Sequence, residues 1–582
     1  MRMRGGGVPA SDGQPPGEGS ASGGQPPGEG SASDGQPPPR DPASDGRPPG
    51  GGPPVRPSLP ASGWLRGVAA LLAGALPALA FPAPSLWWLA YVALVPWLLL
   101  IRSAATARRA ALDGWIGGIG FVIAVHHWLV PSLHVFIVLL AALLGLLWAP
   151  WGVLAGRLLG GAPSPLRAAA AVVAVPSGWL VIELVRSWEG LGGPWGLLGA
   201  SQWEVGPALR VASVGGVWLV SLLVVAVNTA LVLVTTARAS ARTTAGVLLV
   251  VCVLAVTGAW AWAPRPAAAG TARIAVVQPG VIAGRDSVER RLARGEELTR
   301  TVAGRDVDLV VWGESSIGAG AWQDPETARR LAALSRETGA DLLVNVDARQ
   351  TDGSGRSGIF KSAVLVGPDG PTGDRYDKMR LVPFGEYVPA RSLLGWATSV
   401  GKAAGEDRLR GDRQVVMALP DGDRRLRIGP LVCFESAFPD MSRRLTRDGA
   451  QILVAQSATS TFQQSWAPAQ HASLGALRAA ENGRPMVHAT LTGISAVYGP
   501  RGERIGQPLG TDVSAAAVYD VPLTRGTTLY TRFGDWAVYG ALAALAALCA
   551  AEGVRALRRK PAPGSPGRSA RTAHGSPERP GH

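Results

Sequence analysis

One cysteine of this chain lies where a nucleophile is needed. Cys252 and Cys549 fall within long apolar runs, so only Cys433, in the segment Leu431–Ser436, belongs to a soluble region. A lone thiol in an extracytoplasmic domain has no partner for an internal disulfide, which makes chemistry a serious candidate for its presence. The alternative is a small buried hydrophobe, the ordinary state of a free cysteine.

Two further side chains point to the same chemistry. Of the 56 Lys+Arg residues only four are lysines: Lys361, Lys378, Lys402 and Lys560. Lys378 lies in the segment Tyr376–Pro389, where a compact, titratable ammonium is favoured over a planar guanidinium. Glu314 follows the apolar run 309–312 and Gly313, where a strand gives way to a loop, and strand ends commonly hold catalytic groups.

These three side chains can transfer an acyl group together. A thiol attacks a carbonyl as the thiolate and needs a neighbouring base or cation to ionise near neutral pH. Glu314 can take the proton, while Lys378 and the backbone N–H of Phe434 can stabilise the oxyanion. The product is an acyl thioester on Cys433. This chemistry requires no cofactor, and no His/Cys/Asp cluster has the spacing of a metal site.

The chain is too long for one compact domain, at 582 residues. Residues 1–60 repeat a Gly/Pro/Ser-rich unit that begins at Ser11, Ser22, Ser33 and Ser44. Such a sequence cannot bury a core, so we expect a disordered tail, and it lacks the apolar stretch of a secretory signal. The basic tail 553–582 is expected to be disordered as well.

Apolar stretches that can cross a bilayer fill the region 64–264. A span needs roughly 20 residues. Seven stretches are close to that length: 64–81, 84–101, 114–131, 133–154, 168–185, 211–235 and 243–263. An eighth, 535–552, follows the soluble region. The sequence therefore predicts a polytopic α-helical cell-membrane protein with about eight spans.

Arginines in the loops predict its orientation. They cluster after the second, fourth, sixth and eighth spans: Arg102, Arg108, Arg109, Arg157, Arg167, Arg238, Arg242, Arg555 and Arg558. All fall on one side, which should be cytoplasmic, so both termini are expected inside and the region 272–525 outside. The net charge of +14 then reflects topology and attraction to anionic headgroups, and it argues against a nucleic-acid partner.

The region 272–525 carries a different pattern, in which β-prone runs alternate with helical ones. Strands are expected at 273–278, 308–312, 341–346, 363–366, 428–433 and 451–455, and helices at 287–303 and 325–338. The alternation predicts a layered α/β domain.

Three motifs in this order resemble the Glu-Lys-Cys signature of the nitrilase superfamily: Trp312–Ser315, Tyr376–Pro389 and Leu431–Glu435. The membrane frame and the string that starts at Lys378 narrow the resemblance to apolipoprotein N-acyltransferase, of an actinobacterial, Arg-rich type. It covers about residues 64–552. Other residues that carry it are Glu183, Arg186, Pro194, Trp195, Ser201, Gln202, Asn228, Gln470, His471, Arg478 and Glu481.

The resemblance implies a fold, an activity and residue roles. The fold would be an αββα sandwich on the outer face of the membrane. The activity would move an acyl chain from a phospholipid donor to the α-amine of a diacylglyceryl-cysteine on an apolipoprotein acceptor. Cys433 would be the nucleophile, Glu314 the base and Lys378 the oxyanion stabiliser. Glu386 and Glu435 would support the site.

Three departures accompany the resemblance. Gly313 replaces the usual proline before the glutamate, and Phe434 replaces a tyrosine after the cysteine. Neither change removes a reacting group. The loop Gln456–Phe462 contains no asparagine where the family commonly carries one, which predicts a weaker activity or an altered substrate if that side chain holds the site.

Aromatic and leucine side chains suggest a lid over a lipid entrance. Trp195, in the loop after the fifth span, and Leu393, Leu394 and Trp396, after the lysine motif, are the candidates. The alternative is an aromatic belt at the headgroup level. His471 is open between contact with the active site and a structural position.

Two other functions remain open at this point. A membrane-tethered nitrilase-type amidase would use the same three residues on a small amide, although it would need no bilayer access. A non-catalytic scaffold for a polyprenol-phosphate mannosyltransferase partner is the second, and it would tolerate loss of Cys433.

Overall fold

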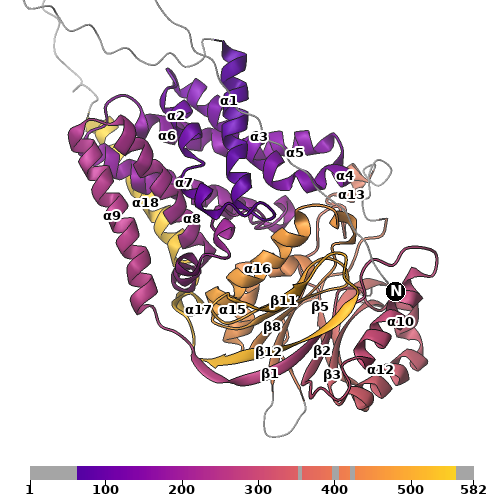
Figure 1. The fold of residues 1–582 in the computed structure, drawn as a ribbon. Helices are drawn as coiled ribbons and strands as arrows, with labels where there is room; N and C mark the ends of the chain where they lie inside the picture. Colours follow the sequence, from indigo (N-terminus) through magenta and orange to yellow (C-terminus); the bar gives the residue numbers. More distant parts are fainter. Residues whose placement is uncertain (1–61, 352–354, 356, 396–404, 420–425, 559–582) are drawn as a thin grey trace, which may run out of the picture. The chain divides into compact units, whose positions relative to one another are not determined.

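The computed structural model describes residues 62–351, 355, 357–395, 405–419 and 426–558. Within these residues, a bundle of apolar helices precedes an α/β domain of two six-stranded sheets, and the helix α18 (Trp536–Arg558) then packs against the bundle again (Figure 1).

The first sheet has the strand order β12-β1-β2-β3-β4-β5. The central strands β1, β2 and β3 are parallel, and the pairs β12/β1, β3/β4 and β4/β5 are antiparallel. Two helices, α10 (Ser287–Arg300) and α12 (Pro325–Thr338), lie on the outer face of this sheet. The strands are β1 Ala267–Gln278, β2 Leu309–Trp312, β3 Asp341–Thr351, β4 Ser357–Gly367, β5 Gly370–Asp377 and β12 Ala515–Arg525.

The second sheet has the order β11-β10-β9-β8-β7-β6, with β7, β8 and β9 parallel. Its outer face carries α15 (Pro439–Arg447) and α16 (Ala467–Asn482). The strands are β6 Met417–Ala418, β7 Arg427–Val432, β8 Ile452–Ser457, β9 Met486–Thr490, β10 Ser495–Tyr498 and β11 Arg504–Leu509.

Side-chain alternation along the strands builds the layers. In β1, Ile274 and Val276 join the core between the two sheets, while Ala275 and Val277 pack under α10 and α12. Successive residues of a strand point to opposite faces, so an apolar strand can serve two cores at once. The result is an αββα sandwich, and the expected fold class is confirmed.

The helix bundle contains six single helices long and apolar enough to span a membrane, within the described residues. They are Gly63–Ala80 (α1 and η1), Ala107–Leu133 (α3, η3 and α4), α7 Pro165–Arg186, α8 Gly206–Thr236, α9 Ala239–Trp262 and α18. A seventh is formed if α5 (Phe136–Gly145) and α6 (Trp148–Leu159), bent by 42° relative to each other, are one span.

The expected eight spans are not fully matched, because the second one is short. Residues Trp87–Arg102 form only a 3-10 turn, η2 (Trp87–Tyr91), and the short helix α2 (Val95–Arg102). Pro96 occupies the first turn of α2, where its missing N–H is harmless. A helix that began earlier in the chain would need that N–H, so α2 cannot extend toward the N-terminus as one continuous span.

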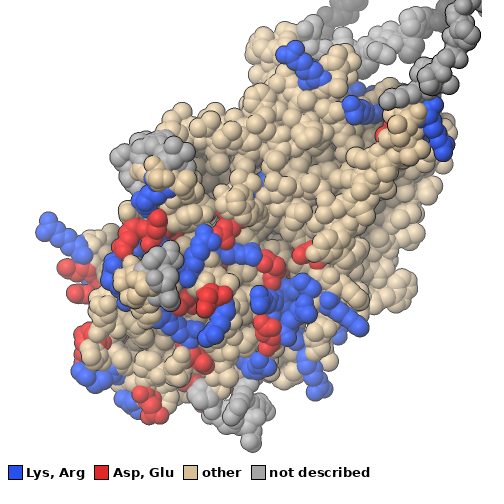
Figure 2. Space-filling model, turned by 180° about the vertical axis from the view of Figure 1, so that it is seen from behind, with Lys and Arg blue, Asp and Glu red and all other residues tan. Residues whose placement is uncertain are grey.

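The surface agrees with a membrane-embedded bundle. Figure 2 shows charged side chains gathered over the α/β domain and at the far end of the bundle, with a broad uncharged band between them.

A buried hydrogen bond joins the α/β domain to the bundle. The Glu481 carboxylate of α16 accepts it from Val217 N of α8 at 2.8 Å. Within α16, Glu481 also pairs with Arg478 at 2.8 Å.

Candidate active site

Three strand ends bring Glu314, Lys378 and Cys433 together. Glu314 follows β2, Lys378 follows β5, and Cys433 opens the 3-10 turn η6 (Cys433–Ala437) after β7. Lys378 Nζ lies 3.2 Å from Glu314 Oε1, and the Glu314 carboxylate is near enough to the Cys433 thiol to raise the pKa of that thiol. The thiol itself donates to Ala458 O at 4.0 Å. The carboxylate therefore contacts the ammonium and acts on the thiol through its charge.

The backbone holds Glu314 tightly at this position. Glu314 N donates to Ser457 O of β8 at 3.1 Å. At Gly313 a Cβ would lie 1.9 Å from Leu491 N, so the close approach of the two sheets requires glycine there. This explains locally why the position before Glu314 cannot be proline, which also carries a Cβ.

The Cys433 thiol is half-buried and lies on a strained turn. Its φ of +52° is left-handed, a conformation that costs a non-glycine residue energy, and the expected strand therefore ends at Val432, one residue early. Burial and the nearby Glu314 carboxylate raise the pKa of the Cys433 thiol to about 12, while Lys378 opposes them. At rest the sulfur is protonated.

Glu386 holds Lys378 from the other side. Its Oε1 accepts from Lys378 Nζ at 2.8 Å and its Oε2 accepts from Val382 N at 2.8 Å. The Lys378 side chain is only 1% exposed. Burial alone would lower the pKa of Lys378, but Glu314 and Glu386 raise it well above its usual value, so the ammonium stays charged.

Glu435 joins the turn of the cysteine to the segment of the lysine. Its Oε1 accepts from Tyr376 OH at 2.7 Å, Met379 N at 2.7 Å and Arg380 N at 3.1 Å. Its Oε2 accepts from Val432 N at 2.8 Å. Burial raises the pKa of Glu435, and these hydrogen bonds oppose the rise. The Glu435 carboxylate therefore binds one hydroxyl and three backbone N–H donors, which join the two segments.

Sequence reasoning missed several residues around Glu314. Lys361 Nζ lies 3.3 Å from Glu314 Oε1. An asparagine also supports the site, although it comes from β3: Asn345 Oδ1 accepts from Ser315 N at 2.9 Å, and Asn345 Nδ2 donates to Gln456 Oε1 at 3.3 Å. The scarcity of lysine in the chain was the one signal that pointed to Lys361.

His471 lies beside the cysteine turn. Its Nε2 is 3.1 Å from Cys433 O and 3.0 Å from Ser436 Oγ. Burial lowers the pKa of His471 to about 4, so the ring is neutral and Nε2–H can donate to the carbonyl. The sequence left open whether His471 contacts the active site or lies elsewhere in the structure, and the structure places it in contact with the Cys433 turn.

Aromatic side chains of the helix bundle and of the α/β domain lie near this turn. Trp195, one of the lid candidates, is buried and donates from Nε1 to Gln470 Oε1 at 2.8 Å, and Trp128 donates to the same oxygen at 3.2 Å. Phe434 packs edge-on against Phe438, with ring centroids 4.9 Å apart. Of the other lid candidates, the side chains of Leu393 and Leu394 and all of Trp396 lie outside the described residues.

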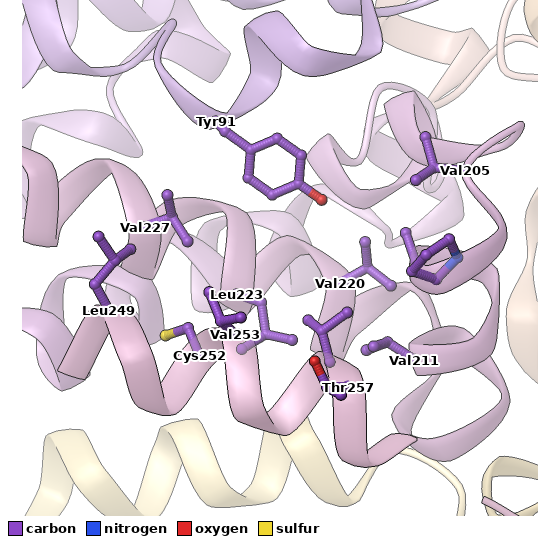
Figure 3. Close-up of a pocket in the computed structure, with 13 residues that line it drawn as sticks. Tyr91, Val205, Val211, Val220, Leu223, Val227, Leu249, Cys252, Val253 and Thr257 are labelled. Atoms are coloured by element: carbon purple, nitrogen blue, oxygen red, sulfur yellow. The ribbon is translucent and has the colours of Figure 1, made fainter. Parts of the chain in front are cut away.

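A separate apolar cavity of about 290 Å³ lies between η2, α8 and α9 (Figure 3). Tyr91 extends its ring toward Val220, and Cys252, Val253 and Thr257 also line the space. None of the candidate catalytic residues lines this cavity. Among the residues that the structure describes, no group of three or more His, Cys, Asp or Glu side chains is placed to hold a metal ion.

Two family models agree with the two-part architecture. Residues 273–528 match the carbon-nitrogen hydrolase family, and residues 73–230 match the apolipoprotein N-acyltransferase N-terminal domain. Among solved structures, an amidase of the nitrilase superfamily from Nesterenkonia is similar, with 21% identity, a TM-score of 0.31, and coverage of 45% of this chain and 93% of that chain.

The matches define a membrane-embedded protein with a carbon-nitrogen hydrolase domain. A relative named apolipoprotein N-acyltransferase from Geobacter metallireducens is 32% identical, over 81% of this chain and 92% of the relative. Another of the same name from Pseudomonas aeruginosa is 31% identical, over 82% and 94%. The chain belongs to the apolipoprotein N-acyltransferase family.

Proposed function

We propose that the protein transfers an acyl chain from a membrane phospholipid to the N-terminal amine of a diacylglyceryl-cysteine on apolipoproteins, through a thioester on Cys433. The observation that carries the proposal is the convergence of Glu314, Lys378 and Cys433 in a domain that is attached to an apolar helix bundle. The names of the relatives supply the substrate class.

In the first half-reaction the Cys433 sulfur attacks the ester carbonyl carbon of the phospholipid while the thiol proton moves to Glu314. The oxyanion is stabilised by Lys378 and by the N–H of Phe434. When the carbon–oxygen bond of the ester breaks, the leaving alkoxide takes the proton from Glu314 and departs as lysophospholipid.

In the second half-reaction the apolipoprotein amine attacks the thioester carbonyl. Glu314 takes a proton from the amine, the carbon–sulfur bond breaks, and the proton passes to the Cys433 thiolate. Glu386 and Glu435 hold the lysine and the cysteine turn throughout. The burial of the site favours an amine over water as the acceptor, because water is largely excluded.

Intact-mass measurement tests this proposal. Purified protein is incubated with phospholipid vesicles, and wild type is compared with Cys433→Ala. We expect an acyl adduct on the wild type alone, and hydroxylamine should release it. A matched variant, Cys252→Ser, should keep the adduct, because Cys252 lies in α9 away from the site. The same adduct on Cys433→Ala would contradict the proposed nucleophile.

The two other functions give different results in this experiment. A Cys433 that reacts with a small amide but takes no acyl chain from phospholipid would favour a membrane-tethered amidase. An inert Cys433 would favour a scaffold for a polyprenol-phosphate mannosyltransferase partner. The buried, charged cluster around Cys433 favours either enzyme over a scaffold, since burying several charges is costly without a use for them.

We propose a catalytic domain (272–525) outside the cell, with cytoplasmic tails 1–60 and 553–582. Support comes from Arg102, at one set of helix ends. Arg102 donates to Gly161 O, after α6, and to Thr236 O, at the end of α8. The membrane segments are 64–264 and 535–552. We also keep Leu393, Leu394, Trp396 and Trp195 as the proposed lid over the lipid entrance.

A further inference from the structure

Two of the four lysines in the chain contact the same oxygen atom. Lys378 Nζ is 3.2 Å from Glu314 Oε1, and Lys361 Nζ is 3.3 Å from it. Lys361 comes from the interior of β4, where its cross-strand partner on β3 is Asp347. Lys361 Nζ lies 3.5 Å from Asp347 Oδ1. A lysine that only served solubility would extend into water from such a strand.

Lys361 is held in place by a hydroxyl as well. Its Nζ donates to Ser315 Oγ at 2.6 Å, and that hydroxyl donates to Asp347 Oδ1 at 3.0 Å. Ser315 has a φ of +54°, so the turn directly after Glu314 is strained and is pinned by this chain of contacts. The Lys361 side chain is 14% exposed, so water screens its charge only weakly.

The charges around Glu314 show what Lys361 contributes. Besides the two lysines, the groups that face Glu314 or its partners are Asp347 of β3, Glu386 of the loop after β5, the Cys433 thiol and the neutral His471 of α16. Three carboxylates are therefore balanced by two ammonium groups. Removal of Lys361 would leave one ammonium for three carboxylates in a buried site.

The positive charge of Lys361 changes the pKa of Glu314. Burial alone would raise the pKa of Glu314, but Lys361 first, and then Lys378, lower it to about 2. Lys361, which lies outside the three-residue signature, is therefore one of two cations that lower the pKa of this carboxylate, and Lys378 adds a hydrogen bond to the effect of its charge.

We infer that Lys361 is a second cationic positioning residue, which keeps the Glu314 carboxylate ionised and oriented toward the Cys433 thiol. The inference rests on the proposed role of Glu314 as the base, and it is independent of the acyl donor and acceptor. Lys378 remains the group beside the developing oxyanion, while Lys361 acts through Glu314 and the Ser315 turn.

The test follows the alkylation of Cys433 by iodoacetamide in the full-length protein with Cys252 and Cys549 changed to Ser. The sulfur–carbon bond forms, iodide leaves, and the thiol proton passes to Glu314, so on the acid side the rate follows the ionised fraction of Glu314. Rates are read by intact mass from about pH 5 to about pH 8, a range below the usual thiol pKa. The variants are Lys361→Met, Lys361→Gln and Lys361→Arg.

A protein with Lys361 should show no acid limb attributable to Glu314 in this range, because a carboxylate with a lowered pKa stays ionised. In Lys361→Met and Lys361→Gln the pKa of Glu314 rises, so less of the carboxylate is ionised at the acid end of the range. The ratio of the alkylation rate at about pH 5 to the rate at about pH 8 should therefore be at least ~3-fold lower than in wild type. Lys361→Arg keeps the charge and should keep the wild-type profile. Arg349→Met, which removes an exposed cation of β3 paired with Glu406, should do so too.

An unchanged profile in both neutral variants would overturn the inference, and so would an equal shift in Lys361→Arg. If Lys361→Met does not fold, Lys361→Gln decides, because it can still donate to Ser315 Oγ without the charge. The measurement uses no lipid. If the neutral variants shift the pH profile but wild type forms no acyl adduct, the proposed function is refuted and the role of Lys361 stands. If wild type forms the adduct but the pH profile is unchanged in the neutral variants, the role of Lys361 is refuted and the proposed function stands.

Discussion

Replacing Glu435 by glutamine should destabilise the catalytic domain although the two side chains have the same shape. The glutamine oxygen can keep the three donors at the Oε1 position, but its NH₂ group then faces Val432 N, which also donates. One buried N–H loses its acceptor, and the remaining bonds lose the assistance of the negative charge. A lost buried bond to a charged group costs about 1.5–3 kcal/mol, so we expect about 3 kcal/mol in total.

Thermal unfolding of the purified protein measures this effect. A loss of about 3 kcal/mol corresponds to a decrease in Tm of about 6–12 °C for a domain of this size. The matched control is Asp440→Asn, because Asp440 is a neighbouring carboxylate, 52% exposed, that binds the Arg380 side chain at 2.5 Å. An exposed pair is worth at most about 1 kcal/mol. A Tm change for Glu435→Gln as small as that of Asp440→Asn would refute the reasoning.

Two other substitutions test the supports of the site. Gly313→Ala should prevent a stable fold, because its Cβ would meet Leu491 N at 1.9 Å, whereas Gly320→Ala, with no atom within 4 Å, should leave Tm unchanged; equal Tm values would contradict this. His471 has a lowered pKa, so its neutral form contributes stability that is lost as the pH falls from 6.5 toward about 4. In His471→Gln the decrease of Tm over this pH window should be smaller, and an unchanged decrease would show that His471 does not contribute to it.

The placement of the three candidate residues at strand ends could be predicted from the sequence. The apolar runs before Glu314 and Cys433 form β2 and β7, and the helices expected at 287–303 and 325–338 form α10 and α12 within three residues of the expected bounds. Apolar periodicity is a local property and survives folding. The left-handed φ at Cys433 is not visible in that pattern, which is why the expected strand ran one residue too far.

The contacts that complete the site could not be predicted, because they depend on register. Lys361 faces Asp347 only through the antiparallel pairing of β3 and β4, and a shift of one residue would turn its side chain to the other face. Gln456 reaches Asn345 across the two sheets in the same way. The asparagine-free loop therefore looked deficient in the sequence, while an asparagine from another strand lies beside the turn that follows Glu314.

The electrostatics of the site suggest how a half-buried cysteine stays unreactive until a substrate arrives. With the pKa of Glu314 lowered to about 2 and that of Cys433 raised to about 12, the proton rests on sulfur, so thiolate formation alone is strongly unfavourable. In the proposed mechanism the negative charge moves from sulfur to the substrate oxygen, where Lys378 can stabilise it. Proton transfer then becomes favourable only together with attack on a carbonyl. Because Cys433 is partly exposed, a small soluble electrophile can reach it, and so the alkylation profile of Cys433 reports the charges of the site before any acyl chain is bound.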